Sequence, residues 1–322
     1  MNNLLAVKDL HTYFHLRNGV VKAVEGVSIE VKQGEVVGIV GESGCGKSMT
    51  ALSIMRLIQP PGRIEKGEII FKGRDLLKME DEELRKIRGS EISMIFQEPM
   101  TALNPVFTVG YQIEEVLKLH SELGKEERKS RVIEMMRKVG LPDPEKRYRE
   151  YPHQLSGGMR QRVMIAMALI MNPSLVIADE PTTALDVTIQ KQILELMKTL
   201  KREYDMSLIF ITHDMGVVRE ISDRVYVMYA GKIVEEGSVE EIFENPLHPY
   251  TVGLLDSIPS VNIEDRKKPL KSIEGSVPDP ANKPSGCPFH PRCEKAMDIC
   301  RNVEPPLVKI SETHFVRCHL YG

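Results

Sequence analysis

Short apolar runs recur along the chain, and the later ones are separated by longer stretches with helical periodicity. The runs lie at residues 36–40, 92–96, 175–178, 207–211 and 224–228. Apolar runs of this length, bounded by turn residues, are typical of buried strands. Because the later runs alternate with helical patterns, the sequence predicts an α/β fold with a doubly wound, largely parallel sheet.

Three regions depart from this alternation. The first forty residues form short apolar segments broken by turns, which predicts a β-rich entry. Residues 109–140 are charged and helical in pattern, as expected of a helical insertion. Beyond Gly237, proline and charge become frequent, and residues 261–284 have the composition of a linker or an irregular surface segment. These changes predict one domain over 1–255, with a helical subdomain at about 100–165, and an extension over 256–322.

Composition and charge exclude several classes of protein. With 42% hydrophobic residues, the chain can form a substantial core. A formal net charge of −3 lacks the basic excess that nucleic-acid-binding proteins usually carry, so no nucleic-acid partner is expected. No run approaches the roughly 18 apolar residues of a membrane span, and the first residues lack the features of a signal peptide. The expected location is therefore the cytoplasm.

Residues 41–48 read Gly-Glu-Ser-Gly-Cys-Gly-Lys-Ser and form a complete phosphate-binding motif. The glycines allow backbone N–H groups to curl around phosphates, Lys47 can reach the β- and γ-oxygens, and Ser48 can hold Mg²⁺. The alternative is a glycine-rich turn that arose by chance. The apolar run before the motif and the helical pattern after it favour the phosphate-binding loop, because such a loop connects a strand to a helix. The thiol of Cys45 is interpreted as a small, permissive side chain. The predicted nucleotide-binding residues of this segment are Gly41, Ser43, Gly44, Cys45, Gly46, Lys47, Ser48 and Met49.

Two later motifs carry complementary chemistry. Residues 155–159 read Leu-Ser-Gly-Gly-Met and open a helical pattern, so the amides of Ser156, Gly157 and Gly158 could bind phosphate. At the end of the apolar run 175–178, Asp179 can serve Mg²⁺ and Glu180 can polarise an attacking water. His213 follows another apolar run, where it can sense a γ-phosphate.

Together with Gln97 and residues 184–186 (Ala-Leu-Asp), these motifs resemble an ABC-transporter ATPase subunit over roughly residues 4–255. The resemblance implies a P-loop NTPase of ABC type, with a RecA-like core, an antiparallel β subdomain and a helical subdomain. It implies that ATP is the nucleotide and that Gln97 couples the site to membrane subunits. It also implies an aromatic residue that stacks on adenine, for which Phe14 is favoured and adjacent Tyr13 is the alternative. The implied catalytic group is Glu180, His213 and Gln97, and the implied Mg²⁺ ligands are Ser48, Gln97 and Asp179.

The same resemblance implies partners. Two ATPase subunits would meet head to tail, so that Ser156 and Gly158 of one chain contact the γ-phosphate held by Lys47 of the other. Two transmembrane permease subunits would complete the transporter, with an extracellular peptide-binding protein acting indirectly. The chain would then lie on the inner face of the membrane. A heterodimer with a related ATPase is favoured over a homodimer.

Two stretches indicate a branch of the family. Residues 97–105 and residues 245–251, which read Asn-Pro-Leu-His-Pro-Tyr-Thr, are similar to dipeptide and oligopeptide importer ATPases. Nickel importers share much of this pattern and remain an alternative. A soluble ABC ATPase of translation or DNA repair is a further alternative, although such proteins usually have two fused nucleotide domains or a long coiled-coil insertion. Physically, His-Pro-Tyr is expected to shape a turn before a helix.

Four of the five cysteines lie in the last tenth of the chain, at Cys287, Cys293, Cys300 and Cys318. In a cytoplasmic protein this grouping favours metal ligation over disulfides. Zinc sites usually have pairs of ligands two to four residues apart, and these cysteines form no such pair. An iron–sulfur cluster also binds four cysteine thiolates and depends less on that spacing. The extension also resembles that of peptide-importer ATPases with a 4Fe-4S cluster. The sequence therefore predicts a small irregular metal-binding extension with a cluster, and leaves zinc, free thiols or a docking module as alternatives. His290, His314 and His319 could replace a thiolate.

Overall fold

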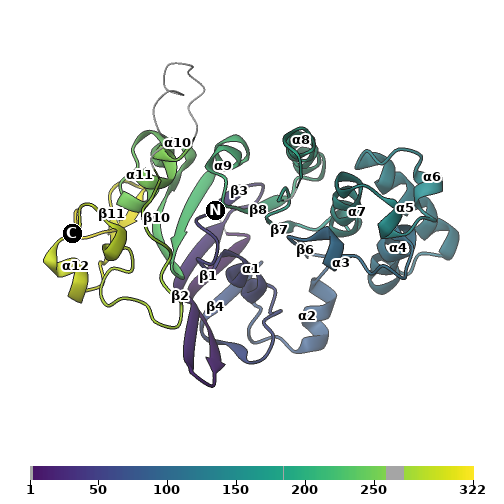
Figure 1. Ribbon diagram of the computed structural model, residues 1–322. Helices are drawn as coiled ribbons and strands as arrows, with labels where there is room; N and C mark the ends of the chain where they lie inside the picture. The colour runs from purple at the N-terminus through teal and green to yellow at the C-terminus, as the bar shows by residue number, and fades with distance from the viewer. Residues whose placement is uncertain (1–2, 184, 259–271) are drawn as a thin grey trace, which may run out of the picture. The chain divides into compact units, whose positions relative to one another are not determined.

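The computed structural model describes residues 3–183, 185–258 and 272–322 of the chain (Figure 1). Two features discussed above fall partly outside these residues: Ala184 of the Ala-Leu-Asp motif, and 261–271 of the expected linker. Contacts within the chain define two compact units, which are described in turn. The first unit comprises Met1–Lys32, Val36–Leu77 and Phe210–Gly322, and the second comprises Gln33–Glu35 and Lys78–Ile209.

The first unit contains an antiparallel sheet with the strand order β2-β1-β4-β5. β1 (Leu5–Leu16) and β2 (Gly19–Val31) form a long hairpin whose turn is at Arg17 and Asn18. β1 pairs on its other side with β4 (Gly62–Phe71), which in turn pairs with β5 (Arg74–Asp75). The β-rich entry is therefore confirmed.

A second group of strands in the same unit has the order β11-β12-β10-β9-β3. β3 (Val36–Val40) is buried throughout and pairs in parallel with β9 (Arg224–Tyr229), whereas β9 pairs in antiparallel with β10 (Lys232–Ser238). The C-terminal extension joins this sheet, because β12 (Phe315–Arg317) pairs with β10 and with β11 (Leu307–Lys309). In Figure 1 the extension lies beside α10 and α11. The helices of this unit are α1 (Lys47–Ile54), α9 (Met215–Ile221), α10 (Val239–Glu244), α11 (Pro249–Asp256), the 3₁₀ turn η3 (His290–Arg292) and α12 (Asp298–Asn302).

The core of this part of the unit mixes residues from its strands, its helices and the extension. Val40, Val227 and Tyr229 from the sheet pack in one buried cluster with Tyr250 of α11 and Phe289 of the extension. Tyr229 lies 4.6 Å from Tyr250 and 5.2 Å from Phe289, measured between ring centroids. Such aromatic pairs bury a large area and fix relative orientation. The extension is thus packed into the core of the first unit.

The second unit contains the parallel pair β6 and β7, with Ile95 opposite Ala178, and a group of helices. Helices α4, α5, α6 and α7 lie together in the blue and teal part of Figure 1, in the region where the sequence predicts the helical subdomain. β8 (Ser207–Thr212) begins in this unit and ends in the first, because the division falls at Phe210. The elements are α2 (Asp81–Ile87), β6 (Ile92–Ile95), α3 (Pro99–Ala102), α4 (Val109–His120), α5 (Lys125–Lys138), α6 (Pro144–Arg147), η1 (Pro152–Gln154), α7 (Gly157–Leu169), β7 (Leu175–Asp179) and α8 (Val187–Tyr204).

The five apolar runs named above all form strands, which confirms their interpretation. Among the described residues, none of the helices combines the length and the apolar character required to cross a bilayer.

Candidate nucleotide-binding site

The phosphate-binding motif forms the connection between β3 and α1 in the first unit. Gly46 precedes the first residue of α1 and has a φ of 104°, in the left-handed region that side chains rarely adopt. A Cβ atom at Gly46 would lie only 2.4 Å from the carbonyl oxygen of Ala23 in β2. The loop is therefore closely packed against the antiparallel sheet at the point where the helix begins.

Lys47 is folded back over this loop. Its Nζ atom donates to the carbonyl oxygen of Gly41 at 2.8 Å and to that of Glu42 at 3.0 Å, and only 4% of the residue is exposed. A buried ammonium group needs such partners because an unpaired charge is costly to bury. Phosphate oxygens are stronger acceptors than carbonyls, so the same position suits Lys47 for binding a triphosphate.

Cys45 belongs to the loop and is fully buried. Burial raises the pKa of its thiol, so the thiol stays protonated at neutral pH. A Cβ atom on Gly41 would come within 2.9 Å of the Cys45 sulfur, which leaves little room around this side chain. Cys45 thus has the surroundings of a small packing residue. Elsewhere in the motif, Ser43 and Gly44 are exposed, and Ser48 and Met49 are half-buried.

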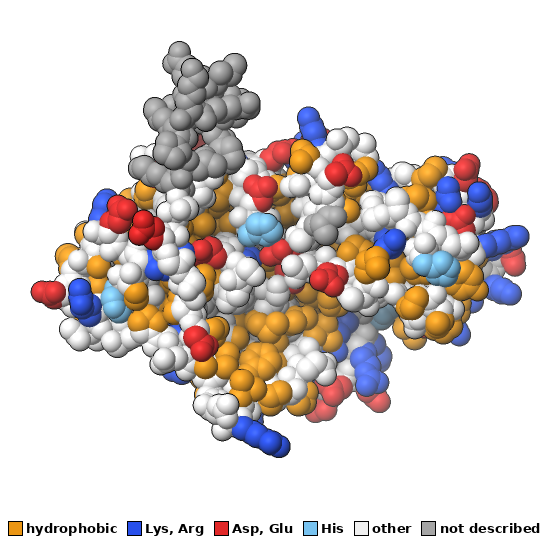
Figure 2. Space-filling model, in the orientation of Figure 1, with side chains coloured by type: hydrophobic (Ala, Val, Ile, Leu, Met, Phe, Trp, Pro, Cys, Tyr) orange, Lys and Arg blue, Asp and Glu red, His pale blue; other side chains and the backbone are white. Residues whose placement is uncertain are grey.

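The two aromatic candidates for adenine binding, Tyr13 and Phe14, lie in β1 directly after Thr12. Thr12 links β1 to α1 through its side chain. The hydroxyl of buried Thr12 lies 2.7 Å from that of Ser53 in α1. Phe14 packs closely against Gly62, since a Cβ there would lie 2.5 Å from its ring, whereas the Tyr13 hydroxyl lies 2.9 Å from Nδ1 of His11. Hydrophobic side chains gather over the lower strands of this sheet in Figure 2, as an adenine ring would require.

His213 also belongs to the first unit. It directly follows β8 and is exposed, while its neighbour Asp214 caps α9 by accepting from the amides of Gly216 and Val217. The cap fixes the backbone immediately after His213.

In the second unit, Gln97 and Glu180 meet directly. The side-chain amide of Gln97 donates to Oε2 of Glu180 at 3.0 Å, and the hydroxyl of Thr183 donates to the same oxygen at 2.9 Å. Glu180 directly follows β7, and Gln97 comes two residues after β6. Because β6 and β7 are parallel neighbours, their carboxyl ends bring the two side chains together. The structure thus places two of the three predicted catalytic residues in contact.

Both acidic residues at the end of β7 are buried, with 4% of Asp179 and 8% of Glu180 exposed. Glu180 has a φ of 45°, a conformation that is uncommon for residues other than glycine. Backbone outliers of this kind persist where the surrounding structure holds them, often at functional sites. Glu180 is therefore held in a defined orientation by its backbone, by Gln97 and by Thr183.

The Leu-Ser-Gly-Gly-Met motif begins α7. The side chain of Ser156 caps this helix by accepting from the amide of Met159 at 3.4 Å, and Ser156 and Gly157 are exposed. A Cβ on Gly158 would come within 2.8 Å of Ile189 in α8, so glycine allows these helices to approach. The motif thus presents exposed amides at a helix N-terminus, as predicted. Asp186 caps α8 by accepting from the amide of Ile189 at 3.0 Å.

The structure thus distributes the predicted residues over both units. The first unit holds the phosphate-binding loop, the two aromatic candidates and His213, and the second holds Gln97, residues 156–158, Asp179 and Glu180.

The expected metal site of the extension is not confirmed. Within 3–183, 185–258 and 272–322, no group of three or more His, Cys, Asp or Glu side chains is arranged to hold a metal ion. The structure has free thiols at Cys287, Cys293, Cys300 and Cys318, of which all but Cys293 are buried. Burial raises the pKa of Cys287 to about 11 and also raises the pKa values of Cys293 and Cys318. Without a metal, desolvation therefore keeps the thiols of Cys287, Cys293 and Cys318 protonated.

The three histidines that could replace a thiolate have other partners. Nε2 of His314 lies 2.8 Å from Oε1 of Glu235, a carboxylate that is fully buried. Nδ1 of His290 lies 2.9 Å from the carbonyl oxygen of Cys287, and Nε2 of His319 lies 2.9 Å from that of Val303. Each ring thus serves local structure.

The His-Pro-Tyr stretch forms the start of α11, as expected, and also reaches the phosphate-binding loop. His248 caps α11 by accepting from the amide of Tyr250 at 3.0 Å. The hydroxyl of Tyr250 accepts from the backbone amide of Glu42 at 2.7 Å. Sequence reasoning missed this contact, because no spacing rule links residues so far apart along the chain.

Comparisons with known proteins agree with this geometry. The ABC transporter family model matches residues 24–183, and a model of the C-terminal region of oligopeptide/dipeptide transporters matches 234–300. OppD of Bacillus subtilis (strain 168), an oligopeptide transport ATP-binding protein, is 54% identical over 99% of this chain and 89% of its own length. DppD of the same organism, a dipeptide transport ATP-binding protein, is 51% identical over 99% of this chain and 95% of its own length.

A solved structure shows the same fold. The dimeric ATP-binding cassette MJ0796, in a post-hydrolysis state with ADP and Pi, is similar with a TM-score of 0.66 and 31% identity. The match covers 73% of this chain and 98% of that chain. These similarities show that the chain belongs to the ABC transporter ATPase family, within its oligopeptide/dipeptide branch.

Proposed function

We propose that the chain binds and hydrolyses ATP and thereby energises an ABC importer of dipeptides or oligopeptides. The observation that carries the proposal is the contact between Gln97 and Glu180 at the carboxyl ends of two parallel strands. A carboxylate fixed beside an amide can orient a water molecule for attack on a phosphate. The relatives named as oligopeptide and dipeptide transport proteins support the peptide substrate.

The roles of the other residues follow from their chemistry. Lys47 and the loop amides hold the phosphates, and Ser48, Gln97 and Asp179 would hold Mg²⁺, which neutralises developing charge. Glu180 takes a proton from the attacking water, and His213 contacts the γ-phosphate. Phe14 stacks on the adenine, with Tyr13 as the alternative. The amides of Ser156, Gly157 and Gly158 contact the nucleotide of a second ATPase subunit, so hydrolysis needs a dimer.

An exposed apolar patch supports a permease partner. Met100, Val106, Phe107 and Tyr111 have between 42% and 72% of their surface exposed, and the last two stack with ring centroids 4.9 Å apart. Hydrophobic side chains gather over α3 and α4 in Figure 2. Contiguous apolar surface of this kind marks protein interaction sites. We assign it to a permease subunit at the inner face of the membrane.

Reconstitution with two permease subunits and a peptide-binding protein in lipid vesicles tests this function. We expect ATP-dependent uptake of a labelled peptide, and faster uptake with a related second ATPase than with this chain alone. Uptake of nickel without peptide would instead support a nickel importer. ATP hydrolysis without any association with permeases would contradict the transport function.

We also propose that the four cysteines of the extension hold a 4Fe-4S cluster. The donor set fits, since such clusters bind four thiolates. Burial raises the pKa values of Cys287, Cys293 and Cys318, and the backbone amides of Phe289, Lys295 and Leu320 act in the opposite direction on these thiols. Amide donors favour thiolates over thiols. When bound, the cluster would cross-link a segment that is too small to form its own core.

Anaerobically purified protein is expected to be coloured and to contain about four irons and four sulfides per chain. A Cys293→Ser variant should lose most of this iron. Colourless protein with one zinc per chain would establish a zinc site, and absence of both metals would leave the cysteines as free thiols; either result would overturn the cluster.

A further inference from the structure

An arginine of the C-terminal extension is bonded to the phosphate-binding loop. Nη1 of Arg292 lies 2.7 Å from Oε2 of Glu42, and Nη2 lies 2.9 Å from Oε1. This is the bidentate geometry that gives arginine its strength and directional specificity toward carboxylates. Glu42 is the second residue of the loop, and the partners are separated by 250 positions in the chain.

The surroundings of Arg292 hold the pair in place. Only 5% of its side chain is exposed. Its Nε atom donates to the carbonyl oxygen of Glu274 at 2.9 Å, and Nη2 also donates to that of Ile273 at 3.3 Å. Its guanidinium lies 5.9 Å from the ring of Tyr229. The backbone amide of Glu42 is bound by the Tyr250 hydroxyl, as described above. Glu42 is thus fixed at both its side chain and its backbone.

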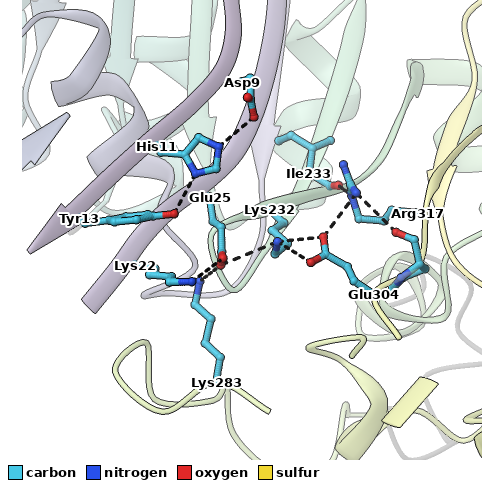
Figure 3. Close-up of polar contacts among 11 residues, drawn as sticks. Asp9, His11, Tyr13, Lys22, Glu25, Lys232, Ile233, Lys283, Glu304 and Arg317 are labelled. Carbon is cyan, nitrogen blue, oxygen red and sulfur yellow. Dashed lines mark hydrogen bonds and ion pairs between the residues drawn. The ribbon is translucent and has the colours of Figure 1, made fainter. Parts of the chain in front are cut away.

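The extension makes a second contact near the same loop. Nζ of Lys283 lies 3.2 Å from Oε2 of Glu25 in β2. Figure 3 shows this carboxylate beside Lys22 and Lys232 as well, and Lys232 also pairs with Glu304 of the extension. β2 is the strand against which Gly46 packs. The extension is therefore tied both to the loop and to the strand that supports it.

The charge of Glu42 explains why this pairing matters for nucleotide. A carboxylate in a loop that receives a triphosphate repels that ligand, and the repulsion is strong where water is partly excluded. A buried arginine offsets the charge and also keeps the carboxylate turned toward the extension. We propose that Arg292 is a positioning residue of the nucleotide site, which holds the phosphate-binding loop through Glu42 and removes a repulsion against ATP. This inference rests on the proposed ATP-binding function.

The test measures ATP affinity by calorimetry on the full chain in the presence of Mg²⁺. Arg292→Gln is expected to weaken ATP binding about tenfold, because Glu42 is left charged and unpaired. The double variant Glu42→Gln/Arg292→Gln should recover most of this loss, since the repelling charge is gone. Arg292→Lys should lie between wild type and Arg292→Gln, because lysine keeps the charge and loses the bidentate geometry.

A matched control separates this role from general stability. Arg224 forms another partly buried pair in the same unit, with Glu236 at 3.1 Å, in which 14% of the arginine side chain is exposed. Arg224→Gln should lower the melting temperature and leave ATP affinity within about twofold. The inference is overturned if Arg292→Gln binds ATP like wild type, or if the double variant binds no better than Arg292→Gln. Failure of the wild-type chain to bind ATP would instead overturn the proposed function. Should Arg292→Gln not fold, Arg292→Lys and the double variant carry the same comparison.

Discussion

Replacing Glu180 by glutamine is expected to lower ATP hydrolysis by the reconstituted transporter about 10² to 10⁴-fold, with ATP binding nearly unchanged. Glutamine has almost the same shape and still accepts the hydrogen bonds that Gln97 and Thr183 donate to Glu180. It cannot take a proton from water, so only the chemical step is lost. Steady-state phosphate release gives the hydrolysis rate, and calorimetry gives the affinity for ATP.

Thr183→Val is the matched control for this variant. It removes one of the donors to Glu180 and keeps the carboxylate. Because Gln97 still orients the carboxylate, we expect a loss of less than about tenfold in hydrolysis. If Glu180→Gln hydrolysed ATP at a rate similar to that of Thr183→Val, Glu180 would not be the catalytic base.

The sequence predicts the fold correctly where the pattern of apolar residues and the positions of glycine indicate the same local structure. The apolar run 36–40 became β3, and the glycines after it adopt the left-handed conformations that the motif requires. The Leu-Ser-Gly-Gly-Met segment opens a helix, as the sequence predicts, and Ser156 caps it. The sequence also places Gln97 and Glu180 just after apolar runs that form strands, but only the structure shows that these strands are parallel neighbours and that the two side chains meet.

The contacts between the extension and the phosphate-binding loop could not be predicted from the sequence. Arg292 lies beside Cys293, so the sequence drew attention to the metal chemistry of this segment and not to its charges. Glu42 occupies a position at which the phosphate-binding motif allows any residue, so the motif assigns it no role. An ion pair over 250 positions depends on the packing of Tyr229, Tyr250 and Phe289, which no periodicity encodes.

Gly46→Ala is expected to destabilise the protein strongly, because the change combines a strained backbone with a steric clash. An alanine there must adopt a φ of 104°, and its Cβ would lie 2.4 Å from the backbone oxygen of Ala23. Positive φ alone costs about 1 to 3 kcal/mol, and the clash is with backbone that cannot rotate away. We expect a total loss of about 3 kcal/mol or more in unfolding free energy, together with loss of ATP binding.

Gly44→Ala provides the comparison that isolates the clash. Gly44 also has a positive φ, of 80°, but a Cβ there would meet no atom within 4 Å. Only the conformational cost applies, so we expect a loss of about 1 kcal/mol in thermal or denaturant unfolding. Equal losses in the two variants would mean that backbone conformation alone explains the glycine at position 46. A clearly larger loss for Gly46→Ala would show that the loop must lie in direct contact with β2, the strand that Lys283 of the extension also binds.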